Sequence, residues 1–357
     1  MMAQANAAGP LRRSRRWWLM LVVLAGMAAF TYLRPARNAA TAVEFDGSTM
    51  GTTYRVVLGA SGSDADADAL RRSVDSLLLA INASMSTYDA QSELSRFNVF
   101  ADTTPVAISA PFRTVVQQAL DVYTASDGHF DVTVGPLVDA WGFGAVERAA
   151  DPPSRATLDS LRAFVGSDKL RLNEQGLSKS DARVRVDLSA IAKGFAVDQV
   201  SQLLSASGLS EHLVEIGGEL RARGRNVRGE PFRVGIEEPE PDRISVRLAV
   251  ALADRALASS GNYRNFYEVG GVRYAHTIDP ATGAPVRHTL LAVSVLHAEC
   301  SLADAWATAL MAAGPDKAWS LAQANKLDVL LLIDGGEGRV DERLTAGFQQ
   351  AVRRIPN

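Results

Sequence analysis

Apolar residues recur three and four positions apart in several stretches of the chain, which is the spacing of an amphipathic helix. The expected helices cover residues 70–85, 111–126, 157–165, 189–206 and 302–313. Gly208 and the pair Gly314-Pro315 follow two of these stretches, and glycine and proline commonly end helices. Helices are therefore predicted mainly before residue 207, with one more near residue 310.

Alternating apolar and polar residues predict strands, which concentrate in the second half. Residues 44–58 are extended in character, and residues 244–252 alternate as in a half-buried strand. Gly270-Gly271 marks a hairpin turn between extended runs, and further strands are expected at 290–296 and 329–333. Strands and helices mix without strict βαβ alternation. This order predicts an α+β fold, with mixed sheets and packed helices in two intimate lobes that form a cleft.

The N-terminus joins a basic cluster to an apolar segment. Four arginines between residues 12 and 16 precede an apolar run over 17–33, and two arginines follow it. The run is close to the roughly 20 residues that cross a bilayer as a helix, and also to the upper length of a signal-peptide core. The arginine difference predicts a cytoplasmic N-terminus. We favour an uncleaved anchor; cleavage near 25–29 and twin-arginine export through 14–19 are the alternatives.

This interpretation divides the chain into four parts. Residues 1–16 form a cytoplasmic basic tail, 17–33 a transmembrane signal-anchor, 34–43 a linker and 44–357 the functional domain. The expected location is the inner membrane, crossed once, with the domain facing the periplasm.

Composition narrows the possible chemistry. The 357 residues are 47% hydrophobic and 22% charged, and the net charge of −3 argues against nucleic acid as a partner. Cys300 is the single cysteine, so an intramolecular disulfide and a thiolate-rich metal site are both excluded. We expect Cys300 to be a small buried residue rather than a catalytic thiol. A metal site in this chain would use oxygen ligands.

Asp304 and Thr308 are the first candidate ligands. They lie four residues apart on a predicted helix, so the carboxylate and the hydroxyl share one face. Mg²⁺ takes hard oxygen ligands and few protein contacts, leaving positions for phosphate and water. The same spacing is common on solvated helix faces, so it does not establish a site by itself.

Two further segments carry candidate chemistry. Lys193 stands near the start of a predicted helix with Asp187, Ala190 and Gly194 around it, where a lysine and the helix N-terminus can meet a pyrophosphate. A capped helix with a surface lysine is the alternative. His276 precedes a turn of composition Asp-Pro-x-Thr-Gly and is a candidate general base, although a lone histidine is more often structural.

Together these segments resemble the ApbE family, the FAD:protein FMN transferases. The resemblance covers about residues 44–340 and rests on motifs in a fixed order. These are Gly-Ser-Thr-Met-Gly-Thr at 47–52, Met-Ser-Thr-Tyr at 85–88, Ser-Glu-Leu-Ser-Arg-Phe-Asn at 92–98, Phe-Asp-Val-Thr-Val-Gly-Pro-Leu at 130–137, Trp-Gly-Phe-Gly at 141–144, 187–194, Gly-Gly-Glu at 217–219, Ser-Gly-Asn-Tyr at 260–263, 276–280, and Ala-Asp-Ala at 303–305 with Thr308.

The resemblance implies roles for particular residues. The positions that match FAD contacts of the family, together with Ser260 of its motif, are Met50, Tyr88, His129, Phe130, Asp131, Asp187, Lys193, Ser260 and Ile278. At His129 only a backbone role is expected. The carbonyl of Ala190, with Asp304 and Thr308, matches the magnesium site, and His276 matches the base for the incoming hydroxyl. Many relatives carry a lipoprotein cysteine after the signal; this chain has none there.

The implied reaction is magnesium-dependent transfer of FMN from FAD to a Thr or Ser hydroxyl of a target flavoprotein, with release of AMP. Lys193 and Mg²⁺ would neutralise the pyrophosphate, and His276 would deprotonate the hydroxyl. The implied acceptors are flavoprotein subunits of respiratory electron-transfer complexes. The alternatives are an FAD pyrophosphatase, which replaces the hydroxyl with water, and a non-catalytic periplasmic flavin carrier.

The topology prediction can be tested with a reporter enzyme that is active only outside the cytoplasm, fused after residue 357. We expect reporter activity in the membrane fraction, because the arginine-flanked segment should export the domain and retain it. Soluble, released reporter would contradict the anchor, and an inactive reporter would contradict export.

Overall fold

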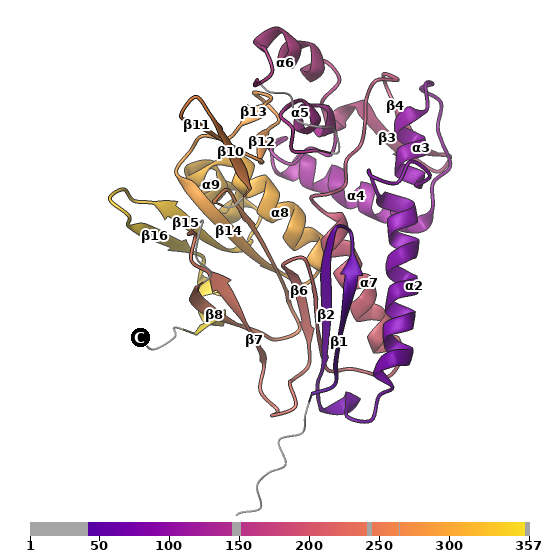
Figure 1. Cartoon of the computed structure of the whole chain (residues 1–357), viewed down its shortest axis with the longest axis vertical. Helices are drawn as coiled ribbons and strands as arrows, with labels where there is room; N and C mark the ends of the chain where they lie inside the picture. The colour runs from indigo at the N-terminus through magenta and orange to yellow at the C-terminus, as the bar shows by residue number, and fades with distance from the viewer. Residues whose placement is uncertain (1–41, 145–150, 241–244, 264, 354–357) are drawn as a thin grey trace, which may run out of the picture. The chain divides into compact units, whose positions relative to one another are not determined.

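An eight-stranded antiparallel sheet is the centre of the computed structural model (Figure 1). The structure describes residues 42–353 apart from 145–150, 241–244 and 264. The strand order is β1-β2-β5-β6-β9-β14-β15-β16. These strands are β1 (Glu44–Thr49), β2 (Thr52–Leu58), β5 (His212–Ile216), β6 (Glu219–Arg223), β9 (Ala256–Gly261), β14 (Leu290–His297), β15 (Asp328–Asp334) and β16 (Val340–Leu344).

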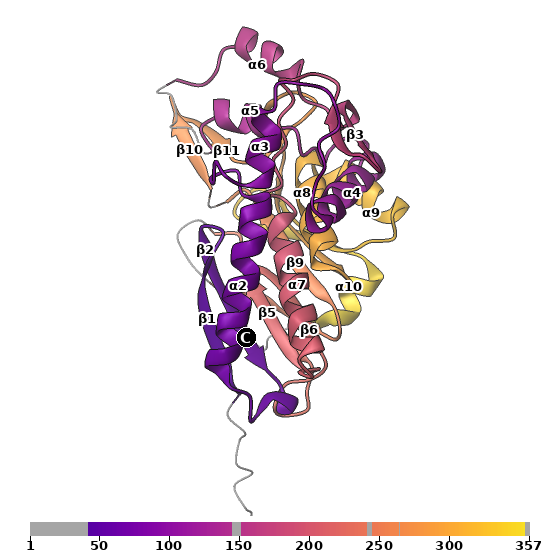
Figure 2. The same cartoon turned by 90° about the vertical axis from the view of Figure 1, so that its right-hand side faces the viewer.

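Several helices cover one face of this sheet, and Figure 2 shows α2 and α7 side by side, whereas α10 packs through Phe348 on the other face. The helices are α2 (Ala67–Met85), α3 (Glu93–Val99), α4 (Ala110–Ala125), α5 (Gly135–Ala140), α6 (Arg155–Arg162), α7 (Ala192–Ala206), α8 (Cys300–Ala313), α9 (Pro315–Ala324) and α10 (Ala346–Ala351). The largest apolar cluster lies between α2, α4, α7, α8 and the sheet. Helix α8 packs directly on β9 and β14, and also against α7.

A second layer covers the other face of the sheet. Strands β7 (Phe232–Glu237), β8 (Val246–Leu252) and β17 (Val352–Arg353) form a three-stranded sheet over a second apolar cluster. Because both faces of β14 are covered, its residues are nearly all buried, and its sequence is an apolar run instead of an alternation. The short pairs are β3 (Leu170–Asn173) with β4 (Gly176–Lys179), β10 (Phe266–Val269) with β11 (Val272–Ala275), and β12 (Ile278–Asp279) with β13 (Ala284–Pro285).

Most sequence-predicted elements are present, and the differences are local. The segment 44–58 is a hairpin rather than one extended run, with Met50 and Gly51 at positive φ in the turn. Helix α7 begins at Ala192, three residues later than expected, so Ala190 precedes the helix. Helix α2 is capped by the Asp66 side chain, which accepts a hydrogen bond from the Ala69 N–H.

The described residues from 42 onward form one compact unit. Within this described part, no helix has both the length and the apolar character to cross a membrane. The predicted anchor at 17–33 and the basic tail lie outside the described residues.

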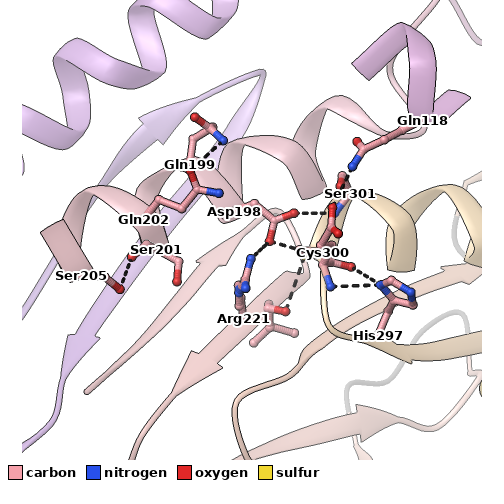
Figure 3. A network of polar contacts seen from close by, with 12 residues as sticks. Gln118, Asp198, Gln199, Ser201, Gln202, Ser205, Arg221, His297, Cys300 and Ser301 are labelled. Carbon is pink, nitrogen blue, oxygen red and sulfur yellow. Dashed lines mark hydrogen bonds and ion pairs between the residues drawn. The ribbon is translucent and has the colours of Figure 1, made fainter. Parts of the chain in front are cut away.

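Helices α7 and α8 are held together at their N-terminal ends. A Cβ atom at Gly194 would stand 2.3 Å from the Cys300 carbonyl oxygen, so only glycine fits this crossing. Asp198, also on α7, accepts hydrogen bonds from the backbone N–H of Cys300 at 2.9 Å and of Ser301 at 3.0 Å (Figure 3). Helix α8 has no side-chain cap of its own, so Asp198 supplies one from α7. The buried carboxylate is also paired with Arg221.

We predict that Gly194→Ala destabilises the protein by about 1–3 kcal/mol, the usual effect of overpacking a core contact. The added methyl group must separate α7 from α8, because the obstructing atom belongs to the backbone. Chemical denaturation of the variant measures the change, and Ala196→Gly, at a buried position of the same helix, is the control for helix propensity. A Gly194→Ala variant as stable as the wild type would contradict this packing constraint.

Candidate functional site

A cavity of about 390 Å³ lies where the N-terminal part of α7 and the middle of α8 face the ends of β6 and β9. It collects residues from segments far apart in the sequence. Those among its lining residues that the sequence had singled out are His129, Phe130, Asp131, Asp187, Ala190, Lys193, Ser260, His276, Ile278, Asp304 and Thr308. All the predicted site residues except Met50 and Tyr88 therefore share one cavity.

Lys193 is half-buried and belongs to a charge cluster with two buried carboxylates, those of Glu219 and Asp304. Its Nζ donates to Glu219 Oε1 at 2.5 Å, and the Asp304 carboxylate lies close enough to raise the pKa of the Lys193 ammonium. Burial alone would lower the pKa of Lys193, but the carboxylates of Asp304 and Glu219 outweigh it and raise that pKa. The lysine is therefore a fixed cation in the wall of the cavity.

Glu219 is the residue of this cluster to which the sequence assigned no role. It is 4% exposed, and its second oxygen, Oε2, is buried with no hydrogen-bond partner in the described part of the chain. Burial, followed by repulsion from Asp304, raises the pKa of Glu219, while Lys193 opposes the rise. The one sequence signal for Glu219 was its place in the Gly-Gly-Glu motif that follows a strand. Sequence patterns could not show that it lies near Lys193, because that contact depends on the β5–β6 hairpin.

Asp304 and Thr308 both face the cavity from α8, as their spacing predicted. Asp304 is 5% exposed, and one of its oxygens accepts from the Gly194 N–H at 3.1 Å. The hydroxyls of Thr308 and Ser260 are 3.4 Å apart. Residue Ala190 lines the same space. One carboxylate beside neutral oxygen donors suits a hard divalent cation that completes its shell with phosphate and water.

Among these candidate ligands, Asp304 is the one residue of the types that most often bind metals, which are His, Cys, Asp and Glu. Across the described residues, no group of three or more His, Cys, Asp or Glu side chains is arranged to hold a metal ion by itself. The cavity residues therefore fit Mg²⁺ held jointly with a phosphate-bearing ligand, and they do not fit a zinc site closed by protein ligands.

His276 lies at the edge of the cavity with its Nδ1 buried and unpartnered among the described residues. Burial lowers the pKa of His276, a hydrogen bond with the Asn265 backbone opposes this, and the Lys193 charge adds to the lowering. The imidazole is thus neutral at pH 7 and can accept a proton. The Phe143 ring packs edge-on against it at a centroid distance of 6.4 Å.

An aromatic stack accounts for the Trp-Gly-Phe-Gly motif beside His276. Tyr267 lies between Phe143 and Tyr274, at centroid distances of 5.2 and 5.3 Å, and Tyr274 contacts Trp141. Trp141 Nε1 donates to the Gly283 carbonyl at 2.8 Å. The stack joins the β10–β11 hairpin to segment 141–144 and packs through Phe143 against His276, which lines the cavity. Sequence periodicity gave no sign of this contact.

The Asp131 carboxylate is occupied by its own surroundings. It accepts from the Thr133 N–H and hydroxyl and from the Ser167 hydroxyl and N–H, at 2.6–3.3 Å. Burial still raises the pKa of Asp131. The side chain therefore shapes the segment that contains His129 and Phe130, and the role of Asp131 as a ligand contact remains a prediction.

Met50 and Tyr88 line an adjoining cavity of about 200 Å³. The two cavities share Ser189 and Lys193, so one extended ligand can occupy both. Tyr88 is 76% exposed, which is unusual for a large aromatic side chain and suits stacking on a flat ring. Both residues remain predictions as ligand contacts.

The cavity sets a lysine beside carboxylate and hydroxyl oxygens, which suits a phosphate-bearing ligand, and comparison with known proteins gives the class of protein. Residues 50–331 match the ApbE family model, so the chain belongs to the ApbE family. It is 41% identical over 315 residues to the FAD:protein FMN transferase of Vibrio cholerae, covering 88% of this chain and 94% of that protein.

Solved structures give the same result. The flavin transferase ApbE from Vibrio cholerae matches with a TM-score of 0.81 and 40% identity, over 87% of this chain and 99% of that one. The apo flavinyl transferase ApbE of Pseudomonas stutzeri matches with a TM-score of 0.79 and 35% identity, over 87% and 96% of the two chains. The predicted α+β architecture is confirmed.

We predict that Glu219→Gln lowers FAD affinity or turnover about tenfold. The amide keeps the shape of the side chain but removes the charge that fixes Lys193, and charged hydrogen bonds contribute about 1.5–3 kcal/mol. Turnover at saturating and at limiting FAD separates the two effects, with the exposed Glu268→Gln as control. Full activity of Glu219→Gln would show that Lys193 needs no anchor.

Proposed function

We propose that this protein catalyses magnesium-dependent transfer of FMN from FAD to a Thr or Ser hydroxyl of a flavoprotein subunit of a respiratory electron-transfer complex, releasing AMP. We further propose that it acts in the periplasm, anchored in the inner membrane by residues 17–33. The observation that carries the catalytic proposal is that one cavity brings together the Lys193–Glu219–Asp304 cluster and a half-buried, neutral His276.

The charge cluster is suited to a pyrophosphate. Lys193 offers a permanent positive charge at the cavity wall, and Asp304, Thr308 and the Ala190 carbonyl would hold Mg²⁺. A bound Mg²⁺ would supply charge neutralisation to the phosphate oxygens during phosphoryl transfer. Glu219 keeps the ammonium of Lys193 in place while the substrate binds.

His276 supplies the base. A neutral imidazole takes the proton from the acceptor hydroxyl as its oxygen forms a bond to the phosphorus on the FMN side. The bond from that phosphorus to the oxygen shared with AMP breaks, and AMP leaves with the electron pair. The product is a phosphoester that links FMN to the acceptor, and no covalent intermediate with the enzyme is required.

One assay separates this function from its alternatives. The purified protein is incubated with FAD, Mg²⁺ and candidate respiratory flavoprotein subunits, and the products are identified by mass spectrometry. Flavinylated subunit plus AMP supports the transferase. Free FMN plus AMP would indicate a pyrophosphatase, and unchanged FAD would indicate a carrier.

We predict that His276→Ala slows transfer by about two to four orders of magnitude, the usual effect of losing a general base. FAD affinity should remain nearly unchanged. Because the pKa of His276 is lowered, the wild-type rate should hold through pH 7 and fall only below the usual histidine range, as the imidazole becomes protonated. A matching loss of FAD affinity would make His276 a ligand contact instead.

We predict that Asp304→Asn loses most transfer activity at low Mg²⁺ and recovers partly at high Mg²⁺. The amide removes the charge that attracts the cation, whereas FAD phosphates still supply ligands. Thr308→Val should show a milder defect. Calorimetric titration of FAD with and without Mg²⁺ measures the coupling, and FAD affinity independent of Mg²⁺ in the wild type would contradict this metal site.

A further inference from the structure

Strand β9 continues beyond the end of its neighbour β6. The two strands pair only through Leu220 opposite Leu257 and Arg221 opposite Ala256. Strand β5 ends and β6 begins at the two-residue turn 217–218. Strand β9 extends past this turn to Gly261, paired with β14. The last three residues of β9, 259–261, therefore lie beyond β6 and have a strand on one side only.

The backbone groups on the open side can be identified from alternation. The Arg255 carbonyl accepts from an N–H of the β6 segment, and the Asn262 N–H donates toward β14. Successive residues of a strand direct their backbone groups to opposite sides, so those of Ser259 and Gly261 point away from β14. No partner for them on that side is found among the described residues. We call this side of residues 259–261 the β9 edge.

The β9 edge separates two hollows. On the helical face, Ser260 approaches Thr308 in the cavity described above. On the other face, Ser259 bonds the Ser294 hydroxyl at 2.7 Å beside a groove of about 360 Å³. The residues shared by groove and cavity are Gly217, Ser259, Ser260 and Gly261. The groove also reaches Asn265, whose carbonyl accepts from the His276 N–H.

We propose that an extended segment of the acceptor protein adds to the sheet as a strand along the β9 edge. An added strand lies about 4.8 Å away and forms main-chain hydrogen bonds, the mode by which many sheet edges bind peptides. Its side chains alternate between the two faces. One of them, the hydroxyl residue, then enters the cavity beside His276, while its neighbours enter the groove.

This inference rests on the proposed transfer to a protein. A hydroxyl on a polypeptide reaches the cavity only if its backbone passes the entrance, and the β9 edge borders the cavity with unpaired backbone groups. Pairing with a second copy of this chain would use the same groups but would block the way to His276. The acceptor is therefore the occupant that the position of the edge favours.

Hydrogen exchange tests the proposal directly. The enzyme with FAD is compared with and without the acceptor subunit identified by the assay above, its hydroxyl residue changed to Ala so that no transfer occurs. Amide exchange at Ser259 and Gly261 should slow by about tenfold or more. Unchanged exchange, while the wild-type enzyme still flavinylates the unaltered acceptor, would overturn docking at this edge and leave the proposed function standing.

Two other outcomes are distinguishable. If no candidate subunit is flavinylated by the wild type, the proposed function fails and the docking inference fails with it. If the same amides are already protected without acceptor, and the protection grows with enzyme concentration, a second copy of the chain occupies the edge and the inference is overturned.

A steric variant gives an independent test. Ala292 lines the groove but not the cavity, so Ala292→Phe should fill the groove without touching the FAD site. We expect the KM for the acceptor to rise about tenfold or more, with FAD affinity and the rate at saturating acceptor unchanged. Ala251→Phe, on β8 and outside the groove, is the matched control. If Ala292→Phe fails to bind FAD, Ala292→Val replaces it, and an unchanged KM in the folded variant contradicts the proposal.

Discussion

The close crossing of α7 and α8 is the constraint on which the site depends. Gly194 lets the two backbones meet, and the Asp198 carboxylate fixes the first turn of α8 to α7. Lys193 lies on one helix and Asp304 on the other, so their separation is set by this contact and by the Gly194–Asp304 hydrogen bond. A rigid frame of this kind holds charged groups near one another at positions they would not adopt in water.

The frame concentrates unbalanced charge. Lys193 is one cation between two carboxylates. Burial raises the pKa of both Glu219 and Asp304, repulsion from Asp304 adds to the rise at Glu219, and Lys193 opposes the rise at both. The cluster is one negative charge in excess when all three groups are ionised. A divalent cation would reverse that sign, which explains in electrostatic terms why an anionic pyrophosphate and the proposed Mg²⁺ should bind better together than apart.

Local patterns in the sequence were sufficient for much of the site. The spacing of Asp304 and Thr308 requires only that α8 be helical, and the apolar periodicity established that helix. Family motifs supplied residues such as Met50 and Ile278, whose local sequence carries no chemical signal. The α+β order also followed from the alternation of helical and extended periods.

Features that depend on long-range pairing were not predictable in this way. Glu219 meets Lys193 only because the β5–β6 hairpin returns beside α7, and the β9 edge exists because β6 begins after the turn 217–218, opposite the middle of β9. The aromatic stack on Phe143 joins residues more than a hundred positions apart. The hairpin at Met50 was missed because its turn places a non-glycine residue at positive φ, which sequence patterns rarely indicate.

The single cysteine has a consequence for where this domain can mature. Cys300 is fully buried at the start of α8, and its thiol donates to the Leu220 carbonyl at 3.5 Å. Burial raises the pKa of that thiol, which keeps it protonated and unreactive. No disulfide has to form within the chain, so folding needs neither an oxidant nor a disulfide isomerase. The same native state is accessible on the reducing and the oxidising side of a membrane.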